Sequence, residues 1–337
     1  MLTIAVDAMG GDIGVEATLP ACAKFLENYS DIKIMIVGDE NKIKSHNAFN
    51  NFHNFSTNLE IIHTDEIITM DDSIETALRK KRKSSMRLAV EQVKNNVANV
   101  CVSSGNTGAL MAVSHYLLKT IPGIDRPAIA TFLPNQKQSS TAVLDLGANA
   151  DCSAYNLLQF ACMADIMVKA VSNIQSPTVG LLNIGEEVIK GNDVVKQAGQ
   201  LLKESELNFY GNVEGNDIFK GTTDIVVCDG FVGNVALKAA EGVAKMISAS
   251  IKQSFSKNIL TKISALFSYN ILKQIRSSFD HRRYNGAMLL GLNGLVVKSH
   301  GSADNIAFFH ALEYAYRASK YNMIEHMQSK FNIANSL

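Results

Sequence analysis

The chain has 337 residues, of which 47% are hydrophobic and 19% are charged, and its 32 basic residues balance its 32 acidic ones. A chain of this length buries a sizeable core without a disulfide or a metal, and its zero net charge gives no general attraction to nucleic acid. The five cysteines form no CxxC pair, and no apolar run approaches 20 residues. This composition argues against a disulfide framework and a membrane-spanning helix.

A strand pattern begins at Thr3, with no charged leader and apolar core before it of the kind that a signal peptide needs. We therefore expect a cytoplasmic protein, and contact with a membrane surface stays open.

Short apolar runs rich in β-branched residues alternate with helix-period segments along the chain, which is typical of a mostly parallel sheet covered by helices. The predicted strands are Thr3–Asp7, Ile32–Gly38, Leu59–His63, Val97–Ser103, Ala128–Leu133, Thr141–Leu146, Thr178–Ile184, Asn208–Asn212, Asp224–Cys228 and Leu289–Val297. The clearest predicted helices are Ile74–Asn95, Cys152–Val171, Asp193–Ser205, Val235–Phe255 and Ser302–Tyr321. No internal repeat and no Pro- or Gly-rich linker divides this α/β pattern.

Six of the predicted strands end in loops that combine glycine with Asn, Asp, Ser or Thr. These loops are Asp7–Asp12, Ser103–Ala109, Asp145–Asn149, Asn183–Glu187 with Lys190, Asp229–Asn234 and Lys298–Ser302. Any one of them is ordinary loop chemistry. Ligands of open α/β sheets bind outside the carboxyl ends of the strands, so a single sheet edge would gather all six loops, and we expect one shared ligand site there.

The type of ligand follows from the motifs that the sequence lacks. The chain has no GxxxxGK[ST] phosphate loop, no GxGxxG after the first strand, no GxSxG elbow and no HExxH pair. What remains is a set of amides and hydroxyls with Lys190, Lys298 and His300 nearby. Such a set suits a small oxyanion and a reaction whose transition state carries negative charge.

Several motifs together resemble one family. They are VDAMGGD (6–12), KSSM (83–86), SSGNTGALMA (103–112), GIDRPA (123–128), DLGAN (145–149), LLNIGEE with KGN (181–192), CDGFVGN (228–234) and the segment from GAMLLGLNG to KSHGS (286–302). Over about residues 2–322 the chain is similar to the PlsX-type phosphate acyltransferases. The family pattern SAGNTGA has alanine where this chain has Ser104, which is a small-for-small change.

The resemblance implies a two-lobed α/β fold with a mostly parallel sheet and flanking helices, similar to phosphotransacetylase and to the isocitrate and isopropylmalate dehydrogenases. It implies a homodimer that forms acyl phosphate reversibly from long-chain acyl-acyl carrier protein and inorganic phosphate, in bacterial phospholipid synthesis, without a cofactor or a metal. It also implies a peripheral membrane protein that passes its product to a membrane glycerol-phosphate acyltransferase. We expect one two-lobed domain over residues 1–325 and a C-terminal tail over 326–337.

In this reaction phosphate attacks a thioester carbonyl, and holding the two substrates face to face can supply up to about 7–11 kcal/mol of the barrier. The amides of Gly105–Gly108 and Gly230–Gly233, at predicted helix N-termini, are candidates to bind phosphate and the oxyanion. The expected catalytic residues are Lys190, His300, Asn183 and Asp229. The expected substrate- and phosphate-binding residues are Asp7, Gly10, Gly11, Ser104, Gly105, Asn106, Thr107, Asp145, Asn149, Gly230, Gly233 and Asn234.

Each charged candidate also has a simpler interpretation. Lys190 is either a cation that offsets the charge of phosphate or a solvated lysine, and His300 either moves a proton or makes a structural hydrogen bond. Unpaired, Asp7, Asp145 and Asp229 would repel phosphate. We therefore expect these three carboxylates to orient neighbouring groups or to cap helices. The neutral side chains of the loop asparagines are better direct contacts for an anion.

Gly10 and Gly11 are expected to let the backbone pass close to the substrate, while Asp12, like Asp7, orients its neighbours. From Gly242 to Phe279 the sequence has no Asp or Glu but several lysines, and Ile251–Arg276 carries apolar residues mostly at spacings of three and four. This segment is either a core-facing helix with a solvated basic side or an amphipathic element that touches anionic lipid.

A second basic run, Arg79–Lys83 with Arg87, is either a solvated helix face or a docking patch for the acidic acyl carrier protein. Three rival functions stay open: a phosphotransacetylase acting on short-chain acyl-CoA, a metal- and NAD-dependent decarboxylating dehydrogenase of the same fold, and a non-enzymatic membrane regulator. The two specific motifs VDAMGGD and DGFVGN favour the phosphate acyltransferase. The clustered aspartates and arginines that the dehydrogenase needs are not recognisable, and all six loops keep the polar residues that a regulator would be expected to lose.

Overall fold

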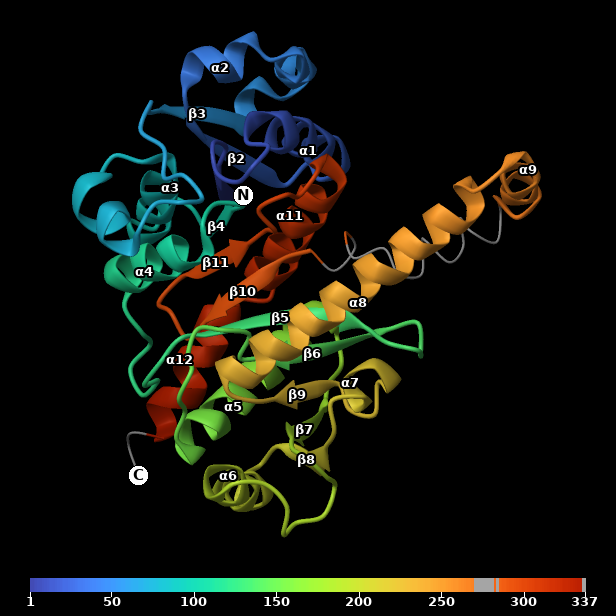
Figure 1. Cartoon of the computed structure of the whole chain (residues 1–337). Helices are drawn as coiled ribbons and strands as arrows, with labels where there is room; N and C mark the ends of the chain where they lie inside the picture. The colour runs from blue at the N-terminus through green and yellow to red at the C-terminus, as the bar shows by residue number, and fades with distance from the viewer. Residues whose placement is uncertain (270–281, 283–284, 335–337) are drawn as a thin grey trace.

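A computed structural model describes residues 1–269, 282 and 285–334 of the chain. Within these residues one mixed sheet of 11 strands runs through the molecule in the order β3-β2-β1-β4-β11-β10-β5-β6-β9-β7-β8 (Figure 1). The strands are β1 Leu2–Asp7, β2 Ile32–Gly38, β3 Leu59–His63, β4 Val100–Ser103, β5 Ala128–Pro134, β6 Ser140–Leu144, β7 Thr178–Leu182, β8 Asn208–Val213, β9 Ile225–Val227, β10 Ala287–Leu290 and β11 Leu295–Lys298.

Helices cover both faces of the sheet and complete an α/β/α sandwich. The α-helices are α1 Val15–Asn28, α2 Glu40–Ser45, α3 Ser85–Lys94, α4 Thr107–Leu118, α5 Ala154–Ser172, α6 Asp193–Glu204, α7 Asp217–Lys220, α8 Gly230–Ser256, α9 Ile259–Phe267, α11 Asn305–Lys320 and α12 Met323–Ala334. The described residues also include the 3₁₀ segment η1 Asn47–Asn58 and the π-helical η2 Thr76–Lys80. The predicted α/β class with a large sheet and flanking helices is confirmed.

Alternation along the strands divides the core into two layers. In β1, Ile4 and Val6 face a layer built with α1, α5, α11 and α12, and Ala5 faces the layer built with α3 and α4. Successive strand residues point to opposite faces, so a strand covered on both faces is apolar throughout. Full burial of one such aliphatic side chain contributes about 1.5–3 kcal/mol. Figure 1 shows the two lobes, with β1 to β4 in one and β5 to β9 in the other.

The expectation that one sheet edge gathers all six loops is wrong. Strands β1, β4 and β11 are parallel to one another, and β6, β9 and β7 are also parallel to one another. Between these sets lie three antiparallel pairings, β11 with β10, β10 with β5, and β5 with β6, so the second set runs opposite to the first. The six loops therefore leave the sheet at two opposite edges, three at each.

Most predicted elements are confirmed within five residues at either end, and two are corrected. The single strand predicted at Leu289–Val297 is an antiparallel hairpin of β10 and β11 with Gly291 at φ 86° between them. The helix predicted at Ile74–Asn95 is interrupted, because Lys81 ends the short η2 and Ser84 adopts an extended backbone ahead of α3. Helices α1 and α4 were not among the clearest predicted helices, although they flank the first two polar loops.

The C-terminal boundary expected after residue 325 falls inside a helix. Helix α12 continues to Ala334, and its Met327 and Phe331 are buried in the layer that contains α5. The described part of the expected tail, up to residue 334, is therefore packed onto the body.

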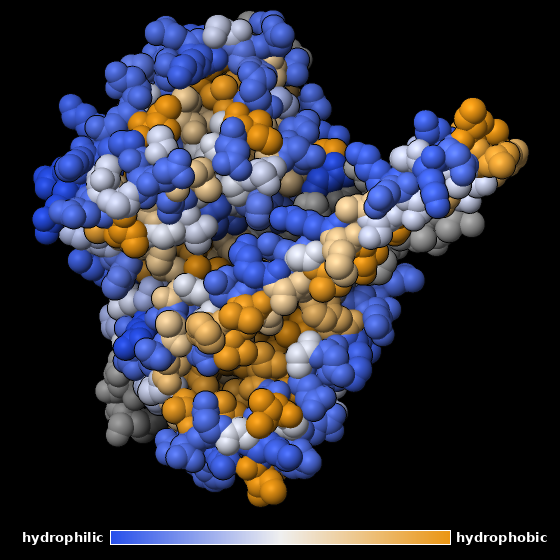
Figure 2. All heavy atoms as spheres, viewed as in Figure 1, coloured by the Kyte–Doolittle hydropathy of each residue, from blue (hydrophilic) through white to orange (hydrophobic). Residues whose placement is uncertain are grey.

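Helices α8 and α9 extend away from both lobes (Figure 1). Among the described residues of α8 only Gly230 and Gly233 are buried, and the tip of α9 exposes Leu266 and Phe267 to 75% and 86%. Figure 2 shows the apolar surface along α8 and at this tip. For residues 251–269 the core-facing interpretation is thus wrong, while residues 270–276 of the predicted amphipathic segment lie outside the described residues. No described helix is both long and apolar enough to cross a membrane.

Candidate active site

The loops after β1, β4 and β11 form one connected group, which we call the first loop group. The hydroxyl of Ser103 donates a 2.6 Å hydrogen bond to Oδ2 of Asp7, and the backbone N–H of Gly105 donates to the same hydroxyl at 3.1 Å. Ser104 donates its hydroxyl to the carbonyl of Gly10 at 2.8 Å. The N–H of Asp12 donates to the carbonyl of Gly301 at 2.8 Å, so all three loops are tied together.

The glycines of this group serve loop packing. A Cβ built at Gly10 would lie 2.5 Å from Oδ2 of Asp7 and 2.8 Å from the backbone N of Gly105. Gly11 has a φ of 82°, and its Cβ would lie 2.7 Å from the carbonyl oxygen of Gly301. The space beside both glycines is therefore taken by neighbouring loops.

Burial shifts the pKa values of Asp7 and Lys298 at this edge of the sheet. Asp7 is fully buried and Lys298 is only 6% exposed. Burial raises the pKa of Asp7, against the hydrogen bond from Ser103 that lowers it. Burial also lowers the pKa of Lys298 to about 8, although Asp7 and Asp12 oppose this shift. The carboxylate therefore lies among hydrogen-bond donors and near a lysine, as expected for a group that orients its neighbours, and its Oδ1 has no hydrogen-bond partner within the described residues.

Helix α4 begins directly after the second of these loops. Oδ1 of Asn106 accepts the N–H of Ala109 at 3.0 Å, and its Nδ2 donates to the carbonyl of Met70 at 2.7 Å, so this side chain is an N-cap already bound to protein groups. Gly105 donates its N–H to Ser103. No hydrogen bond is found for the N–H groups of Thr107 and Gly108 to any part of the chain that the structure describes, as is usual for the first turn of a helix. These two amides are thus available to an anion.

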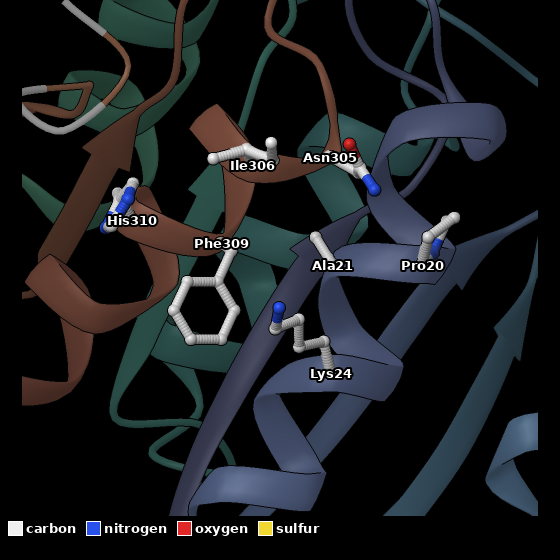
Figure 3. A pocket seen from close by; sticks show the side chains of 7 residues that line it. All are labelled: Pro20, Ala21, Lys24, Asn305, Ile306, Phe309 and His310. Atoms are coloured by element: carbon white, nitrogen blue, oxygen red, sulfur yellow. The ribbon is translucent and has the colours of Figure 1, made fainter. Parts of the chain in front are cut away.

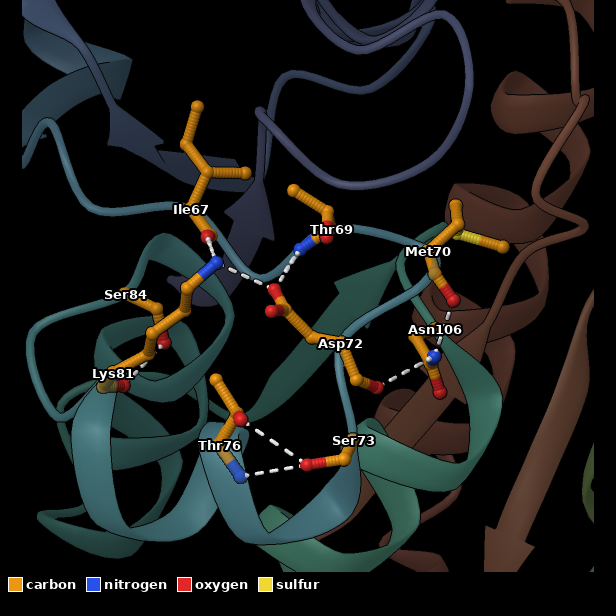
Figure 4. A network of polar contacts seen from close by, with 9 residues as sticks. All are labelled: Ile67, Thr69, Met70, Asp72, Ser73, Thr76, Lys81, Ser84 and Asn106. Carbon is orange, nitrogen blue, oxygen red and sulfur yellow. Dashed lines mark hydrogen bonds and ion pairs between the residues drawn. The ribbon is translucent and has the colours of Figure 1, made fainter.

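A basic residue supports the N-terminus of α4 indirectly. Lys81 pairs with Asp72 at 2.5 Å and donates to the carbonyl of Ile67 at 2.7 Å, and Nδ2 of Asn106 reaches the same 67–72 segment through the carbonyl of Met70 (Figure 4). Arg79 and Arg87 pair with Glu75 and Glu91. Of the predicted docking run, Lys80, Arg82 and Lys83 are exposed without an ion pair among the described residues.

The loops after β6 and β9 form a second loop group at the opposite edge. Asp145 is fully buried and accepts four N–H hydrogen bonds, from the backbone of Ile129, Ala148 and Asn149 and from the side chain of Asn149, at 2.7–3.1 Å. Asn149 also donates to the carbonyl of Pro127 at 2.8 Å. Both side chains therefore hold the loop together, which agrees with an orienting role for Asp145.

Helix α8 begins in the second loop group. Asp229 caps it by accepting the N–H of Val232 at 2.8 Å, which agrees with the cap interpretation. Gly230 donates its N–H to Asn149, and a Cβ at Gly233 would lie 1.9 Å from the carbonyl oxygen of Asp145. The amides of Gly230, Val232 and Gly233 are thus taken by protein acceptors, while Asn234 is exposed.

Helix α8 also connects the two loop groups electrostatically. Its Lys238 lies near enough to Lys298 to lower the pKa of that ammonium group. A helix rises about 1.5 Å per residue, so the eight steps from Gly230 to Lys238 span about 12 Å. Helix α8 therefore passes from the second loop group toward the first.

The loop after β7 stands apart from both groups. Asn183 donates its side-chain amide to the carbonyl of Lys190 at 3.1 Å, and Asn212 of β8 donates to the carbonyl of Glu187 at 3.1 Å. Lys190 and its neighbours Ile184 and Ile189 are exposed. No hydrogen bond or ion pair between this loop and either loop group is found among the described residues, and the loop of Lys190 leaves the sheet at the edge opposite to that of His300.

His300 lies at the surface beside the first loop group. Its N–H donates to Oδ1 of Asn285 at 2.9 Å, and its Nδ1 accepts the N–H of Ser302 at 3.2 Å. Asn285 in turn donates to the hydroxyl of Ser299 at 2.8 Å. The ring is thus oriented by its own loop two residues beyond the buried Lys298.

Among the loop residues of the first group, Ser103 was not among the expected site residues, and Lys298 was named only as a cation near the site. Ser103 links Asp7 to Gly105, and Lys298 is the buried cation. The signal for Lys298 is its position as the last residue of an otherwise apolar strand, LVVK, where a lysine needs a specific acceptor.

A separate hollow lies between α1 and α11, and none of the residues of the six loops lines it. It is lined by Pro20, Ala21, Lys24, Asn305, Ile306, Phe309 and His310 (Figure 3). None of the predicted site residues lines this hollow. Within the described residues no group of three or more His, Cys, Asp or Glu side chains is placed to hold a metal ion.

The sequence matches known proteins over nearly its whole length. A family model described as fatty acid synthesis protein matches residues 2–326. A phosphate acyltransferase from Polynucleobacter asymbioticus is 58% identical over 331 residues, which is 98% of each chain. A phosphate acyltransferase from Cupriavidus necator is 56% identical over 98% of this chain and 92% of the relative.

Solved structures share the fold at much lower identity. A phosphotransacetylase from Streptococcus pyogenes superposes with a TM-score of 0.60 at 15% identity, over 95% of this chain and 94% of the other. The EutD phosphotransacetylase from Staphylococcus aureus gives 0.58 at 14% identity, over the same shares of the two chains. At these identities the likeness concerns the fold alone, and it confirms the predicted similarity to the phosphotransacetylase fold.

Proposed function

Because this chain belongs to the fatty acid synthesis protein family, the PlsX-type phosphate acyltransferases, we propose that it transfers the acyl group of long-chain acyl-acyl carrier protein to inorganic phosphate. The enzyme is an acyltransferase that forms acyl phosphate in lipid synthesis. The observation that carries the proposal is the identity of 58% over nearly the full chain with a phosphate acyltransferase. Two parts of this reaction are proposals: that acyl carrier protein is the acyl donor, and that the acyl chain is long.

In the proposed reaction a phosphate oxygen attacks the thioester carbonyl carbon, and a tetrahedral oxyanion forms. The carbon–sulfur bond then breaks, the thiolate leaves with the carrier protein and takes up a proton, and acyl phosphate remains. Both the phosphate and the oxyanion need preorganised donors. The unpaired N–H groups of Thr107 and Gly108 at the start of α4 are the donors that we assign to phosphate.

His300 is the candidate for proton transfer to or from phosphate or the leaving thiol, since it is exposed at the rim of the first loop group. Asn183 and Lys190 extend from the opposite sheet edge, which argues against their contacting the same phosphate as His300 within one chain. Lys190 as a phosphate-binding cation therefore stays a prediction. Asp229 is proposed to act by fixing the start of α8, with Asn234 exposed one turn later.

The remaining candidates divide into two roles in this proposal. Most of them shape the loops: Asp7, Gly10, Gly11, Ser104, Gly105 and Asn106 shape those of the first loop group, which present the amides of α4, and Asp145, Asn149, Gly230 and Gly233 shape those of the second loop group at the start of α8. Thr107 instead contributes its own N–H group. We propose that the two lobes, with α12 included, act as one domain and that the chain works as a homodimer.

Helix α9 and the end of α8 are the proposed contact with a membrane surface. Leu260, Leu266 and Phe267 are at least 75% exposed, and Lys257 and Lys262 are exposed beside them. Apolar side chains can enter the interface while lysines meet anionic headgroups. Because a long-chain acyl phosphate is poorly soluble in water, membrane contact would allow its delivery to a glycerol-phosphate acyltransferase in the membrane. We propose a cytoplasmic enzyme that binds the inner membrane face peripherally.

Acyl carrier protein is strongly acidic, so its proposed docking sites are the exposed cations Lys80, Arg82 and Lys83 and the lysines of α8. The alternative function is a phosphotransacetylase-like transfer from short-chain acyl-CoA, for which the shared fold is the supporting observation.

The deciding experiment mixes the purified protein with palmitoyl-acyl carrier protein and phosphate. We expect phosphate-dependent release of free carrier protein together with acyl phosphate, detected by gel shift and by hydroxamate formation. The control omits phosphate, and a parallel reaction offers acetyl-CoA. Turnover of acetyl-CoA without turnover of the carrier substrate would replace the proposal with the alternative.

A further inference from the structure

Lys298 has an unusual environment for a lysine. Only 6% of the residue is exposed, and its Nζ donates to the carbonyl of Ser104 at 3.3 Å and to the carbonyl of Ser299. No carboxylate among the described residues lies within ion-pair distance of it. A buried ammonium without a paired anion is costly, so its retention at this position calls for a function.

The carbonyl of Ser104, which accepts from Lys298, belongs to a peptide group whose C=O and N–H are both hydrogen-bonded. In a trans peptide the C=O and the following N–H point in opposite directions. The C=O of Ser104 accepts from Lys298, while the N–H of Gly105 donates to Ser103, which is itself held by Asp7. The peptide between Ser104 and Gly105 is therefore held by Lys298 of β11 at its carbonyl and by the hydrogen-bonded pair of Ser103 and Asp7 at its N–H.

This peptide lies two residues before α4. Its orientation sets the path of Asn106 and hence the direction of the unpaired N–H groups of Thr107 and Gly108. The ammonium group of Lys298, which has no carboxylate within ion-pair distance among the described residues, adds buried positive charge beside the same segment, and this charge favours an anion. We propose that Lys298 is a positioning residue for phosphate, one that holds the Ser104–Gly105 peptide so that the first amides of α4 face the anion, and that its charge adds to their field.

This inference rests on the proposed function, because it assigns Lys298 to the phosphate site of that reaction. Three charged groups face the ammonium from the elements packed against it, Asp7 at the end of β1, Asp12 in the following loop and Lys238 on α8. The net effect is a lysine that loses its proton near pH 8. Phosphate binding should therefore weaken as the pH rises through this value, where phosphate itself is already a dianion.

The test measures binding of inorganic phosphate by the rise in the unfolding temperature that it causes, without any acyl substrate. Lys298→Met removes the charge at similar length, Lys298→Arg keeps it, and Lys203→Met changes an exposed lysine on α6 as the control. We expect Lys298→Met to weaken phosphate binding at least about tenfold at pH 7, the loss expected for one hydrogen bond to a charged group. Lys203→Met should bind as the wild type does.

The pH dependence of phosphate affinity distinguishes a role for the charge of Lys298 from a merely structural role of its side chain. The wild type should lose phosphate affinity above about pH 8, and Lys298→Arg should keep its affinity there, because arginine stays protonated. If Lys298→Met does not fold, this comparison of the wild type with Lys298→Arg still decides. Unchanged phosphate affinity in folded Lys298→Met, or an identical alkaline loss in the wild type and Lys298→Arg, would overturn the inference.

Turnover of palmitoyl-acyl carrier protein is measured separately on the same preparations. A wild type that binds phosphate through Lys298 but turns over no carrier substrate would defeat the proposed function and leave the role of Lys298 intact. A wild type that turns over the carrier substrate, with a KM for phosphate that is unchanged in Lys298→Met, would defeat the role of Lys298 and leave the function intact.

Discussion

The hydroxyl of Ser103 donates a 2.6 Å hydrogen bond to the buried carboxylate of Asp7, and this contact joins the ends of two neighbouring parallel strands. Since Asp7 and Ser103 are direct partners in the β1–β4 ladder, the backbone register itself brings them together. Through Gly105 and Ser104 the same chain of hydrogen bonds continues to Lys298 on the next strand, β11. The edge of the sheet thus becomes one polar unit.

Ser104 tests the packing of the first two loops. Its hydroxyl is buried and donates to the carbonyl of Gly10 at 2.8 Å, so Ser104→Ala leaves that carbonyl without this donor. We expect a loss of about 1 kcal/mol in the free energy of unfolding, measured by urea denaturation. Ser45→Ala, at an exposed serine on α2, is the control and should change stability less. Equal stability of wild type and Ser104→Ala would show that the loops do not depend on this bond.

Lys298 should make the stability of the protein depend on alkaline pH. Its pKa falls from 10.5 in the unfolded chain to about 8 in the folded one, so between these values the unfolded state binds more protons and stability rises with pH. The burial penalty is fully present below pH 8 and gone above 10.5, and its size is about 3 kcal/mol. The stability of the wild type relative to Lys298→Met should therefore rise across this window. A difference in stability between the wild type and Lys298→Met that stays constant with pH would contradict the lowered pKa of Lys298.

Lys190→Glu tests the exposed lysine of the isolated loop. If Lys190 binds phosphate, the reversed charge should raise the half-saturating phosphate concentration by about tenfold or more and leave the KM for the acyl carrier substrate unchanged. Lys196→Glu, on the exposed side of α6, is a matched control nearby. An unchanged phosphate dependence would remove Lys190 from the site, as its position at the opposite sheet edge already suggests.

The apolar tip of α9 should bind vesicles of anionic lipid. Ile263→Glu together with Leu266→Glu places two charges on its exposed face, where insertion into the membrane interface becomes unfavourable. We expect loss of co-sedimentation with vesicles of phosphatidylglycerol while turnover in solution persists. Val97→Glu, at an exposed apolar residue on the body, should leave vesicle binding intact. Undiminished binding by the double variant would refute this contact.

Steering of an acidic carrier by exposed cations predicts a salt effect. The KM for acyl carrier substrate should rise with ionic strength, because the Debye length falls from about 10 Å at 0.1 M to about 3 Å at 1 M. Replacing Lys80, Arg82 and Lys83 together with Gln should raise KM at low salt and reduce its salt dependence. Lys24, Lys94 and Lys203 replaced in the same way provide the control. A KM that ignores salt in the wild type would count against both docking sites.

The sequence alone determined the class of the fold, most of its strands and the positions of its polar loops. Local signals were sufficient there: β-branched runs mark β2 and β3 at their observed bounds, and Asn106 and Asp229 stand where helix caps are needed. The motifs VDAMGGD and DGFVGN also pointed to the family.

Only the tertiary structure decided how these loops are combined. The direction of a strand depends on which neighbour it pairs with, and the antiparallel pairings around β10 and β5 divide six similar loops between two edges. The parallel pairing of β11 with β4 places Lys298 beside Ser103, 195 positions earlier in the chain. It makes a lysine that the sequence offered as one candidate among several the buried cation of the site. Contacts between residues so far apart depend on the packing of the whole sheet, which no local pattern of residues encodes.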